Sequence, residues 1–228
     1  MTKNINKKKL VLIGAGEFAE IAHEYFTHDS DYEVVALSVE RQYLTLPTLA
    51  GLPVVPYEEL ELLYPPDQYE LFVAIPVSQL NRLRTRLYLD AKQRGYRFAT
   101  YISSHAFVWR NAKVGENTFI FENNVIQPFV NVGNNCVLWS SNHIGHRTVI
   151  HDHVFISSHA VISGYCEIGE SCFIGVNSTL ADNVIVGRDC VIGAGALISK
   201  NTEQGKIYPG IPSEVPKVGS LRFYKVKE

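Results

Sequence analysis

Residues 132–156 read VGNNCVLWSSNHIGHRTVIHDHVFI, and every sixth residue of this stretch, from Val132 to Ile156, is Val, Leu or Ile. The same spacing continues without a slip over seventeen positions, from Ile102 to Ile198. A repeat of six residues is too short to bury its own aliphatic side chain, so successive repeats must stack on one another. The spacing therefore predicts an all-β parallel β-helix of hexapeptide repeats over residues 99–200.

Two other positions of the repeat fit this prediction. All four cysteines stand two residues before an aliphatic, where a strand places a second inward side chain, so we expect buried free thiols. Seven glycines directly follow an aliphatic, and we expect them near the corners because glycine accepts backbone angles that other residues avoid. The cysteines are Cys136, Cys166, Cys172 and Cys190, and the glycines are Gly115, Gly133, Gly145, Gly169, Gly175, Gly187 and Gly193.

Three hexads per coil would stack residues that are 18 apart and sort the outward side chains onto three faces of a prism. The first face carries Tyr101, Phe119, Val137, Phe155, Phe173 and Val191. The second face carries Phe107, Val125, His143, Val161, Thr179 and Leu197, and the third face carries Lys113, Asn131, Val149, Glu167 and Ile185. Because long apolar strips are typical of subunit contacts, the first and second faces predict a homotrimer.

Residues 1–98 have a different pattern, in which short apolar stretches alternate with helix-like stretches. We expect strands at 10–13, 33–37, 53–55 and 70–75, and helices at 17–26, 58–63 and 78–94. This alternation is typical of a parallel α/β sheet, and the length fits half of a doubly wound Rossmann fold. The last residues, 201–228, are predicted to form a cap at the open end of the prism and a tail.

The first predicted turn of this domain, Gly14-Ala15-Gly16, begins a G-x-G-x-x-A pattern between a strand and a helix. Backbone N–H groups at such a turn can hold a phosphate of a nucleotide, although close packing of the strand on the helix also requires glycine there. Glu40 stands where a ribose hydroxyl would be bound. The domain leaves no room for a dehydrogenase's substrate domain, which argues against NAD.

A second nucleotide-sugar contact is expected at Pro76 and Ser78, at the carboxyl end of a predicted strand where open α/β sheets bind ligands. Ser78 also has the side chain of a helix N-cap. The alternative is an ordinary helix start followed by a solvated basic face from Arg82, Arg84 and Arg86.

Five of the eight histidines lie between residues 143 and 159. We expect His143 on the second face and His146 at the following corner, beside a seam between subunits, whereas His151, His153 and His159 fit ordinary surface positions. A zinc site would need a third histidine two coils earlier, where Arg110 stands, so no metal is predicted.

Composition excludes several classes of function. The net charge is −2 and no basic stripe is present, which argues against nucleic acid as a partner. No apolar run is long enough for a membrane span, so we expect a cytoplasmic protein without a membrane partner.

Together, the Gly14-Ala15-Gly16 domain, the His146 segment, the hexads and the closing Tyr208-Pro209-Gly210-Ile211-Pro212 resemble the bidomain nucleotide-sugar acyltransferases. These include the sialic-acid O-acetyltransferase-like proteins and the N-acetyltransferases of the bacillosamine, perosamine and viosamine type. The resemblance implies a left-handed β-helix, a trimer, acetyl-CoA between neighbouring helices and a nucleotide sugar on the N-terminal domain. The run SNHIGH at 141–146 looks most like the branch that acts on dTDP-4-amino-4,6-dideoxyglucose.

The resemblance also implies roles for single residues. His146 would be the general base that takes a proton from the C4 amine, a backbone N–H near Gly164 would stabilise the oxyanion, and no acyl-enzyme would form. Relatives often follow the catalytic histidine with an acidic residue and place a second histidine toward the coenzyme, but Arg147 and Phe155 stand at these positions. The expected acetyl-CoA contacts are Phe155, Gly164, Val176 and Ala194, and the residues expected to support His146 are His143, Asp152 and His159.

Other functions remain open from the sequence. A sugar O-acetyltransferase would use the same acetyl donor on a hydroxyl group. A non-enzymatic trimeric scaffold would bind no coenzyme A, and a zinc hydratase would hold stoichiometric metal.

Overall fold

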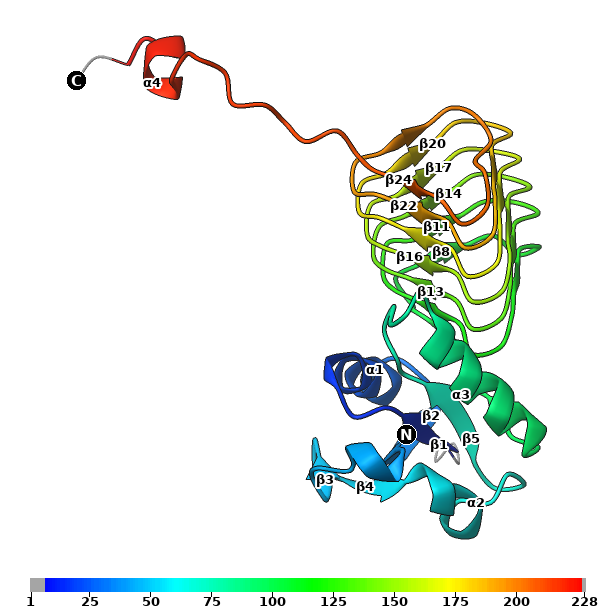
Figure 1. The fold of residues 1–228 in the computed structure, drawn as a ribbon. Helices are drawn as coiled ribbons and strands as arrows, with labels where there is room; N and C mark the ends of the chain where they lie inside the picture. The colour runs from blue at the N-terminus through cyan, green and yellow to red at the C-terminus, as the bar shows by residue number, and fades with distance from the viewer. Residues whose placement is uncertain (1–6, 227–228) are drawn as a thin grey trace, which may run out of the picture.

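The computed structural model describes residues 7–226 and shows an α/β domain at one end of a stack of coils (Figure 1). The N-terminal sheet has the strand order β3-β4-β2-β1-β5-β6. Its strands are β1 (Lys8–Ile13), β2 (Tyr32–Val39), β3 (Thr48–Leu49), β4 (Leu52–Pro56), β5 (Glu70–Val73) and β6 (Arg97–Phe98). All pairs are parallel except β3 with β4, so the predicted parallel α/β domain is confirmed.

The helices of this domain are α1 (Glu17–His28), α2 (Leu60–Leu63) and α3 (Arg82–Gln93), with 3₁₀ turns η1 (Arg41–Tyr43) and η2 (Tyr57–Glu59). The prediction that Ser78 caps a helix is wrong. Residues Gln79, Leu80 and Asn81 all have positive φ, and α3 begins only after Asn81, without a side-chain cap. Three residues in this backbone region break the helix that the sequence pattern suggested from residue 78.

The second domain is a parallel β-helix of two-residue strands in three sheets. The first sheet contains β7 (Tyr101–Ile102), β10 (Phe119–Ile120), β13 (Val137–Leu138), β16 (Phe155–Ile156), β19 (Phe173–Ile174), β22 (Val191–Ile192) and β24 (Ile207–Tyr208). The second contains β8 (Phe107–Val108), β11 (Val125–Ile126), β14 (His143–Ile144), β17 (Val161–Ile162), β20 (Thr179–Leu180) and β23 (Leu197–Ile198). The third contains β9 (Lys113–Val114), β12 (Asn131–Val132), β15 (Val149–Ile150), β18 (Glu167–Ile168) and β21 (Ile185–Val186).

The hexad aliphatics form the core of this stack as the sequence predicts. Strands 18 residues apart pair in parallel, for example Phe119 with Val137, and the aliphatics from Ile120 to Ile192 are buried. The four cysteines are free and buried in the same core. Burial raises the pKa of both Cys136 and Cys172 to about 12, so these thiols stay protonated at neutral pH.

The corner glycines are needed for a reason other than the one expected. None of the seven has positive φ. A Cβ atom on Gly145 would instead lie 2.5 Å from the backbone N of Gly164 in the next coil, so the coils approach too closely for a side chain there. The positive φ values fall two residues later, at positions such as Arg147 and Tyr165.

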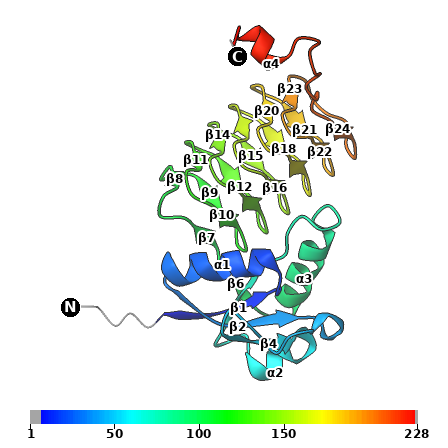
Figure 2. The same ribbon diagram turned by 90° about the vertical axis from the view of Figure 1, so that its left-hand side faces the viewer.

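The first face of the prism is covered by the chain's own N-terminal domain. Phe119 is fully buried, and its ring lies 5.8 Å from the ring of Phe18 and 5.7 Å from that of Phe26, both in α1. Figure 2 shows α1 lying across the first coils. The prediction that this face contacts a neighbouring subunit is therefore wrong for its covered part, whereas Phe107, Val161 and Leu197 of the second face remain exposed.

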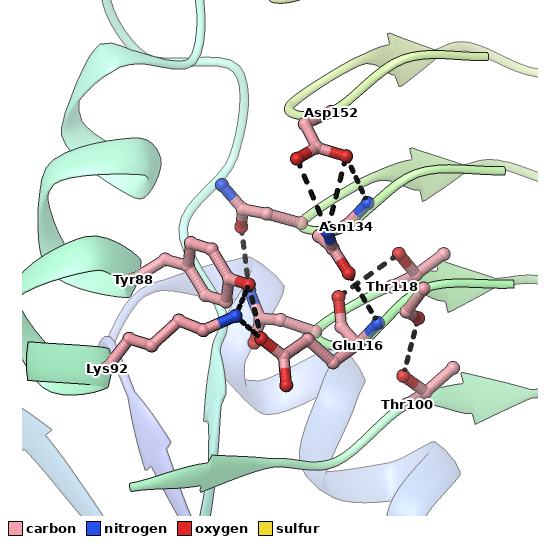
Figure 3. A network of polar contacts seen from close by, with 10 residues as sticks. Tyr88, Lys92, Thr100, Glu116, Thr118, Asn134 and Asp152 are labelled. Carbon is pink, nitrogen blue, oxygen red and sulfur yellow. Dashed lines mark hydrogen bonds and ion pairs between the residues drawn. The ribbon is translucent and has the colours of Figure 1, made fainter. Parts of the chain in front are cut away.

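Helix α3 fastens the domain along the corner between the third and first sheets. Arg82 pairs with Asp189, and the buried Arg84 donates from Nη2 to the carbonyl oxygen of Asn135 at 3.1 Å. At the other end of α3, Tyr88 and Lys92 both contact Glu116 (Figure 3). Because these contacts run from the first coils to a late one, the two domains form one packed unit.

A column of side chains at this corner ends on His153, which is buried against Tyr88. The amide of Asn117 donates to the amide oxygen of Asn135 at 2.7 Å, and the Nδ2 of Asn135 lies 2.9 Å from Nδ1 of His153. Since an amide nitrogen can only donate, Nδ1 must accept and the imidazole is neutral. Burial also lowers the pKa of His153 below its ordinary 6.5.

We therefore expect His153 to make the fold sensitive to acid. As the pH falls through 6.5 the unfolded chain binds a proton on this histidine more readily than the folded chain, so the unfolded state holds more protons and the free energy of unfolding falls. Melting temperatures between pH 5 and 8 should fall more steeply toward acid for the unaltered protein than for His153→Asn, which extends the asparagine column. Equal slopes for both proteins would contradict this account.

The chain leaves the stack after β24 (Figure 1). Every residue from 211 to 226 is exposed, including the short helix α4 (Ser220–Phe223). Residues 201–208 complete a last coil, but 211–226 do not cover the open end, contrary to the predicted cap; residues 227 and 228 lie outside the described part. No helix among residues 7–226 combines the length and apolar character that crossing a bilayer requires.

Candidate active site

His146 lies at the corner between the second and third sheets, just after β14 and before β15. This corner is opposite the first sheet, and the side chain is exposed. Its ring lies over the next coil, because a Cβ on Gly164 would be 2.6 Å from Cε1 and 3.0 Å from Nδ1. The ring of Tyr165 meets the imidazole edge to face, with centroids 5.0 Å apart. Gly164 is thus required for this ring position.

The backbone around Gly164 does not offer the expected oxyanion donor. The N–H of Gly164 donates to Oδ1 of Asp182 at 2.9 Å. The N–H groups of Ser163 and Tyr165 donate to carbonyl oxygens of Leu180 and His146. The expectation that an N–H at this point stabilises the oxyanion is therefore not supported by this chain alone.

The residues expected to support His146 do not share its corner. His143 is half-buried on the second face, and His159 stands at the corner between the first and second sheets. Asp152 belongs to the corner that faces α3, where its Oδ1 accepts the N–H of Asn134 at 2.7 Å (Figure 3). The nearest charged neighbour in the sequence, Arg147, places its guanidinium over the ring of Phe129.

Two other histidines have partners of their own. His151 pairs with Glu167 at 2.8 Å, and His153 is buried under α3. Within residues 7–226, no three His, Cys, Asp or Glu side chains are grouped as a metal site would require.

The expected acetyl-CoA contacts do not form one groove within a chain. Phe155 is only 6% exposed and lies under the N-terminal domain, with the guanidinium of Arg84 5.8 Å from its ring, so the prediction of a coenzyme contact there is wrong. Val176 and Ala194 stand at the corner between the first and second sheets, whereas Gly164 stands at the other edge of the second sheet. These two corners can line one groove only when the corner of a second chain lies alongside that of the first.

The predicted nucleotide residues come together in a cavity of about 320 Å³ at the carboxyl ends of β1 and β2. Gly14, Ala15, Gly16 and Glu40 line it. The carboxylate of Glu40 accepts two hydrogen bonds from Arg86, at 3.1 and 2.8 Å, so this acidic group is neutralised at the cavity edge.

Sequence reasoning missed one member of this cavity. Ser38 is fully buried at the end of β2, lines the cavity, and its hydroxyl has no hydrogen-bond partner within the described residues. A buried hydroxyl without a partner is unfavourable unless a ligand completes it. A lone polar residue in the apolar run of β2 was the signal that could have identified it.

Glycine is needed at the two positions of this turn for different structural reasons. Gly14 has φ +130°, and a Cβ there would lie 2.6 Å from the carbonyl oxygen of Ala74, so the fold itself requires glycine. Gly16 has extended backbone angles and nothing within 4 Å of where its Cβ would be. Packing of the strand on the helix therefore explains Gly14 but not Gly16, which keeps space open at the start of α1.

A neighbouring cavity of about 360 Å³ is lined by Pro76 and Ser78 and shares Gly16 with the first. It reaches Trp139, which follows the first-sheet strand β13. Both cavities therefore lie on the side of the first sheet. His146 lies at the opposite corner, so a single chain does not bring these two parts together.

Comparison with known proteins supports this architecture. Residues 165–200 match the family model described as bacterial transferase hexapeptide (six repeats), and no curated protein sequence matches the chain. The acetyltransferase domain of PglB from Neisseria gonorrhoeae FA1090 is 25% identical, with a TM-score of 0.81 over 91% of this chain and 99% of that one. The same domain has been solved with acetyl coenzyme A, at 24% identity and a TM-score of 0.80 over 91% and 98% of the two chains.

Perosamine N-acetyltransferase from Caulobacter crescentus, in a mutant form with CoA and GDP-perosamine, has a TM-score of 0.80 at 23% identity over 92% of this chain and 97% of that one. WeeI from Acinetobacter baumannii AYE has a TM-score of 0.68 at 19% identity, over 90% and 94% of the chains. These two matches show the fold. The comparisons thus confirm an α/β domain followed by a left-handed β-helix of hexapeptide repeats. They also confirm the chain's resemblance to the bidomain sugar acetyltransferases.

Proposed function

We propose that this protein transfers the acetyl group of acetyl-CoA to the C4 amine of a nucleotide-linked 4-amino-4,6-dideoxy sugar. The observation that carries the proposal is the exposed imidazole of His146, held over Gly164 at an edge of the hexad stack. The match to an acetyltransferase domain that binds acetyl coenzyme A supports both the reaction and the donor. The run SNHIGH at 141–146 favours dTDP-4-amino-4,6-dideoxyglucose as the acceptor.

The proposed reaction needs one proton acceptor and no covalent intermediate on the protein. The amine nitrogen attacks the thioester carbonyl carbon, the new C–N bond forms, and the imidazole of His146 takes the proton that the nitrogen loses. The C–S bond then breaks, and the coenzyme leaves as a thiol after receiving a proton. The four cysteines are buried in the core, so none of them offers a nucleophile for an acyl-enzyme.

The nucleotide would occupy the cavity at Gly14, Gly16 and Ser38. Gly16 leaves the start of α1 open to a phosphate, where free backbone N–H groups favour an anion. The unpartnered hydroxyl of Ser38 gives the cavity a polar group for the nucleoside. The sugar would extend through the neighbouring cavity past Pro76 and Ser78.

The position of His146 supports a site made by two chains. Since the nucleotide cavities lie at the first sheet and His146 at the opposite corner, the amine must be presented to the histidine of a neighbour. The exposed apolar residues of the second face, including Leu197 at 70% exposure, supply a contact surface for the proposed homotrimer. In this arrangement Gly164 of one chain and Val176 and Ala194 of the next would line the acetyl-CoA groove.

The test is an assay of acetyl transfer to dTDP-, UDP- and GDP-linked 4-amino sugars, with release of the coenzyme thiol followed over time. We expect the dTDP sugar to gain one acetyl group that resists mild alkali, because an amide survives treatment that removes an ester. An alkali-labile product would instead show a sugar O-acetyltransferase. Absence of coenzyme A binding would indicate a scaffold, and stoichiometric zinc would indicate a hydratase.

Replacing Gly16 by valine is expected to raise the KM for the nucleotide sugar by about tenfold or more, since the side chain would fill the open space at the start of α1. The KM for acetyl-CoA should stay unchanged, and the melting temperature should fall by only a few degrees, because Gly16 is the N-cap of α1 and valine is disfavoured there. Gly219→Val is the matched control, because Gly219 also has nothing near its Cβ position but lies in the tail. An unchanged KM for the nucleotide sugar in Gly16→Val would contradict this assignment of the cavity.

A further inference from the structure

Positive φ recurs at the third residue after most hexad aliphatics, and half of these positions carry asparagine, aspartate or glycine. Asparagine, aspartate and glycine adopt this backbone region at low cost, while bulky side chains do so with strain. The tolerant residues are Asn117, Asn123, Asn135, Asn177, Asn183, Asp189 and Gly195.

The corner that carries His146 departs from this pattern in three successive coils. Phe129, Arg147 and Tyr165 have φ of 66°, 60° and 59° and lie 18 residues apart in one column. Bulky residues kept in an unfavourable backbone region point to a role that outweighs the strain. Nothing in the core of the stack requires them, because all three side chains are exposed.

These three side chains form one stack beside the imidazole. The guanidinium of Arg147 lies 4.5 Å from the ring centroid of Phe129 and 6.0 Å from that of Tyr165. The ring of Tyr165 then meets the imidazole of His146 at an interplanar angle of 81°. With Gly164 beneath it, the imidazole is confined on two sides by consecutive residues of the next coil.

We propose that Tyr165, held by Arg147 and Phe129, is a positioning residue that fixes the imidazole of His146 for proton transfer; this rests on the proposed function. No carboxylate among residues 7–226 forms a hydrogen bond or ion pair with that imidazole, and the contacts that its own chain makes with the ring are the packing contacts of Gly164 and Tyr165. Edge-to-face aromatic contacts have a defined geometry and suit this task. The role needs the ring of Tyr165 and not its hydroxyl, which has no hydrogen-bond partner in the described structure.

The test compares Tyr165→Phe with Tyr165→Asn. The phenylalanine variant keeps the ring, so its kcat should stay within about twofold of the unaltered value, whereas the asparagine variant should lose about 10- to 100-fold in kcat. The melting temperature of Tyr165→Asn should stay equal or rise, because asparagine accepts positive φ more readily. A KM for acetyl-CoA that rises while kcat is kept would overturn the proposal and make Tyr165 a coenzyme contact.

A second measurement does not depend on turnover. The rate at which diethylpyrocarbonate modifies His146, read by peptide mass spectrometry, should rise severalfold in Tyr165→Asn and not in Tyr165→Phe. Phe129→Asn, which frees Arg147 without touching His146, should show a smaller rise. Absence of turnover in the unaltered protein would contradict the proposed function alone, and equal modification rates in all variants would overturn the positioning role alone.

Discussion

Replacing His146 by alanine is expected to lower kcat by about 10²- to 10⁴-fold, the range over which a positioned general base contributes. The loss should fall on kcat, because the side chain is exposed and the fold uses only its backbone, whose N–H donates to Gln127 at 2.9 Å. The affinities for acetyl-CoA and nucleotide sugar, the melting temperature and the oligomeric state should all remain unchanged.

Steady-state kinetics with calorimetric titration of both substrates would measure this separation. His151→Ala is the matched control, since His151 is also an exposed histidine of the stack but pairs with Glu167 on another corner. We expect that control to retain nearly full turnover. Turnover near normal in His146→Ala, with both substrates still bound, would remove His146 from the proposed mechanism.

Mixed assemblies of two impaired variants are expected to regain activity. In His146→Ala the nucleotide cavity is intact, and in Gly16→Val the imidazole is intact. Because these two parts lie on opposite sides of one prism, a complete site needs the cavity of one chain and the histidine of another. Random mixing in equal amounts should leave about one site in four complete in any closed ring of identical contacts.

The measurement uses the two variants coexpressed with different affinity tags and purified through both, so that every assembly is mixed. Turnover is then assayed at a nucleotide-sugar concentration too low for Gly16→Val alone. In a trimer that contains both variants one of the three sites is complete, so recovery toward about a third of the unaltered rate would support the two-chain site. Mixed assemblies with no more activity than the separate variants would show that each chain uses its own histidine.

Much of the fold is predictable because aliphatic residues at a fixed spacing determine it. The hexads from Ile102 to Ile198 set the strands, the stacking of residues 18 apart and the inward thiols, and the structure agrees at each point. What covers an outward apolar strip is not encoded in the strip itself. The pattern of the first face therefore predicts contact with a neighbouring subunit, whereas Phe18 and Phe26 of the same chain cover it.

The candidate site is less predictable from sequence because its contacts join residues 18 or 19 apart in different coils. His146 was identified through a family resemblance, but its contacts with Gly164 and Tyr165 depend on how the coils lie on one another. The same holds for Ser38, whose lack of a partner is visible only when the cavity is formed. The glycine turn was open to two explanations, and only the structure separates Gly14 from Gly16.

The reactivity of the four buried thiols would report local unfolding of the stack. Within the stack each coil packs on its neighbours, and the α/β domain reaches the late coils only through the start of α3, where Arg82 pairs with Asp189. The tail leaves that end of the stack uncovered, so we expect loosening to start there. Cys190 lies nearest that bare end and Cys136 nearest the clasped one. Alkylating reagents would therefore modify the cysteines in reverse order of the sequence. The order of modification would show how far unfolding has proceeded along the β-helix.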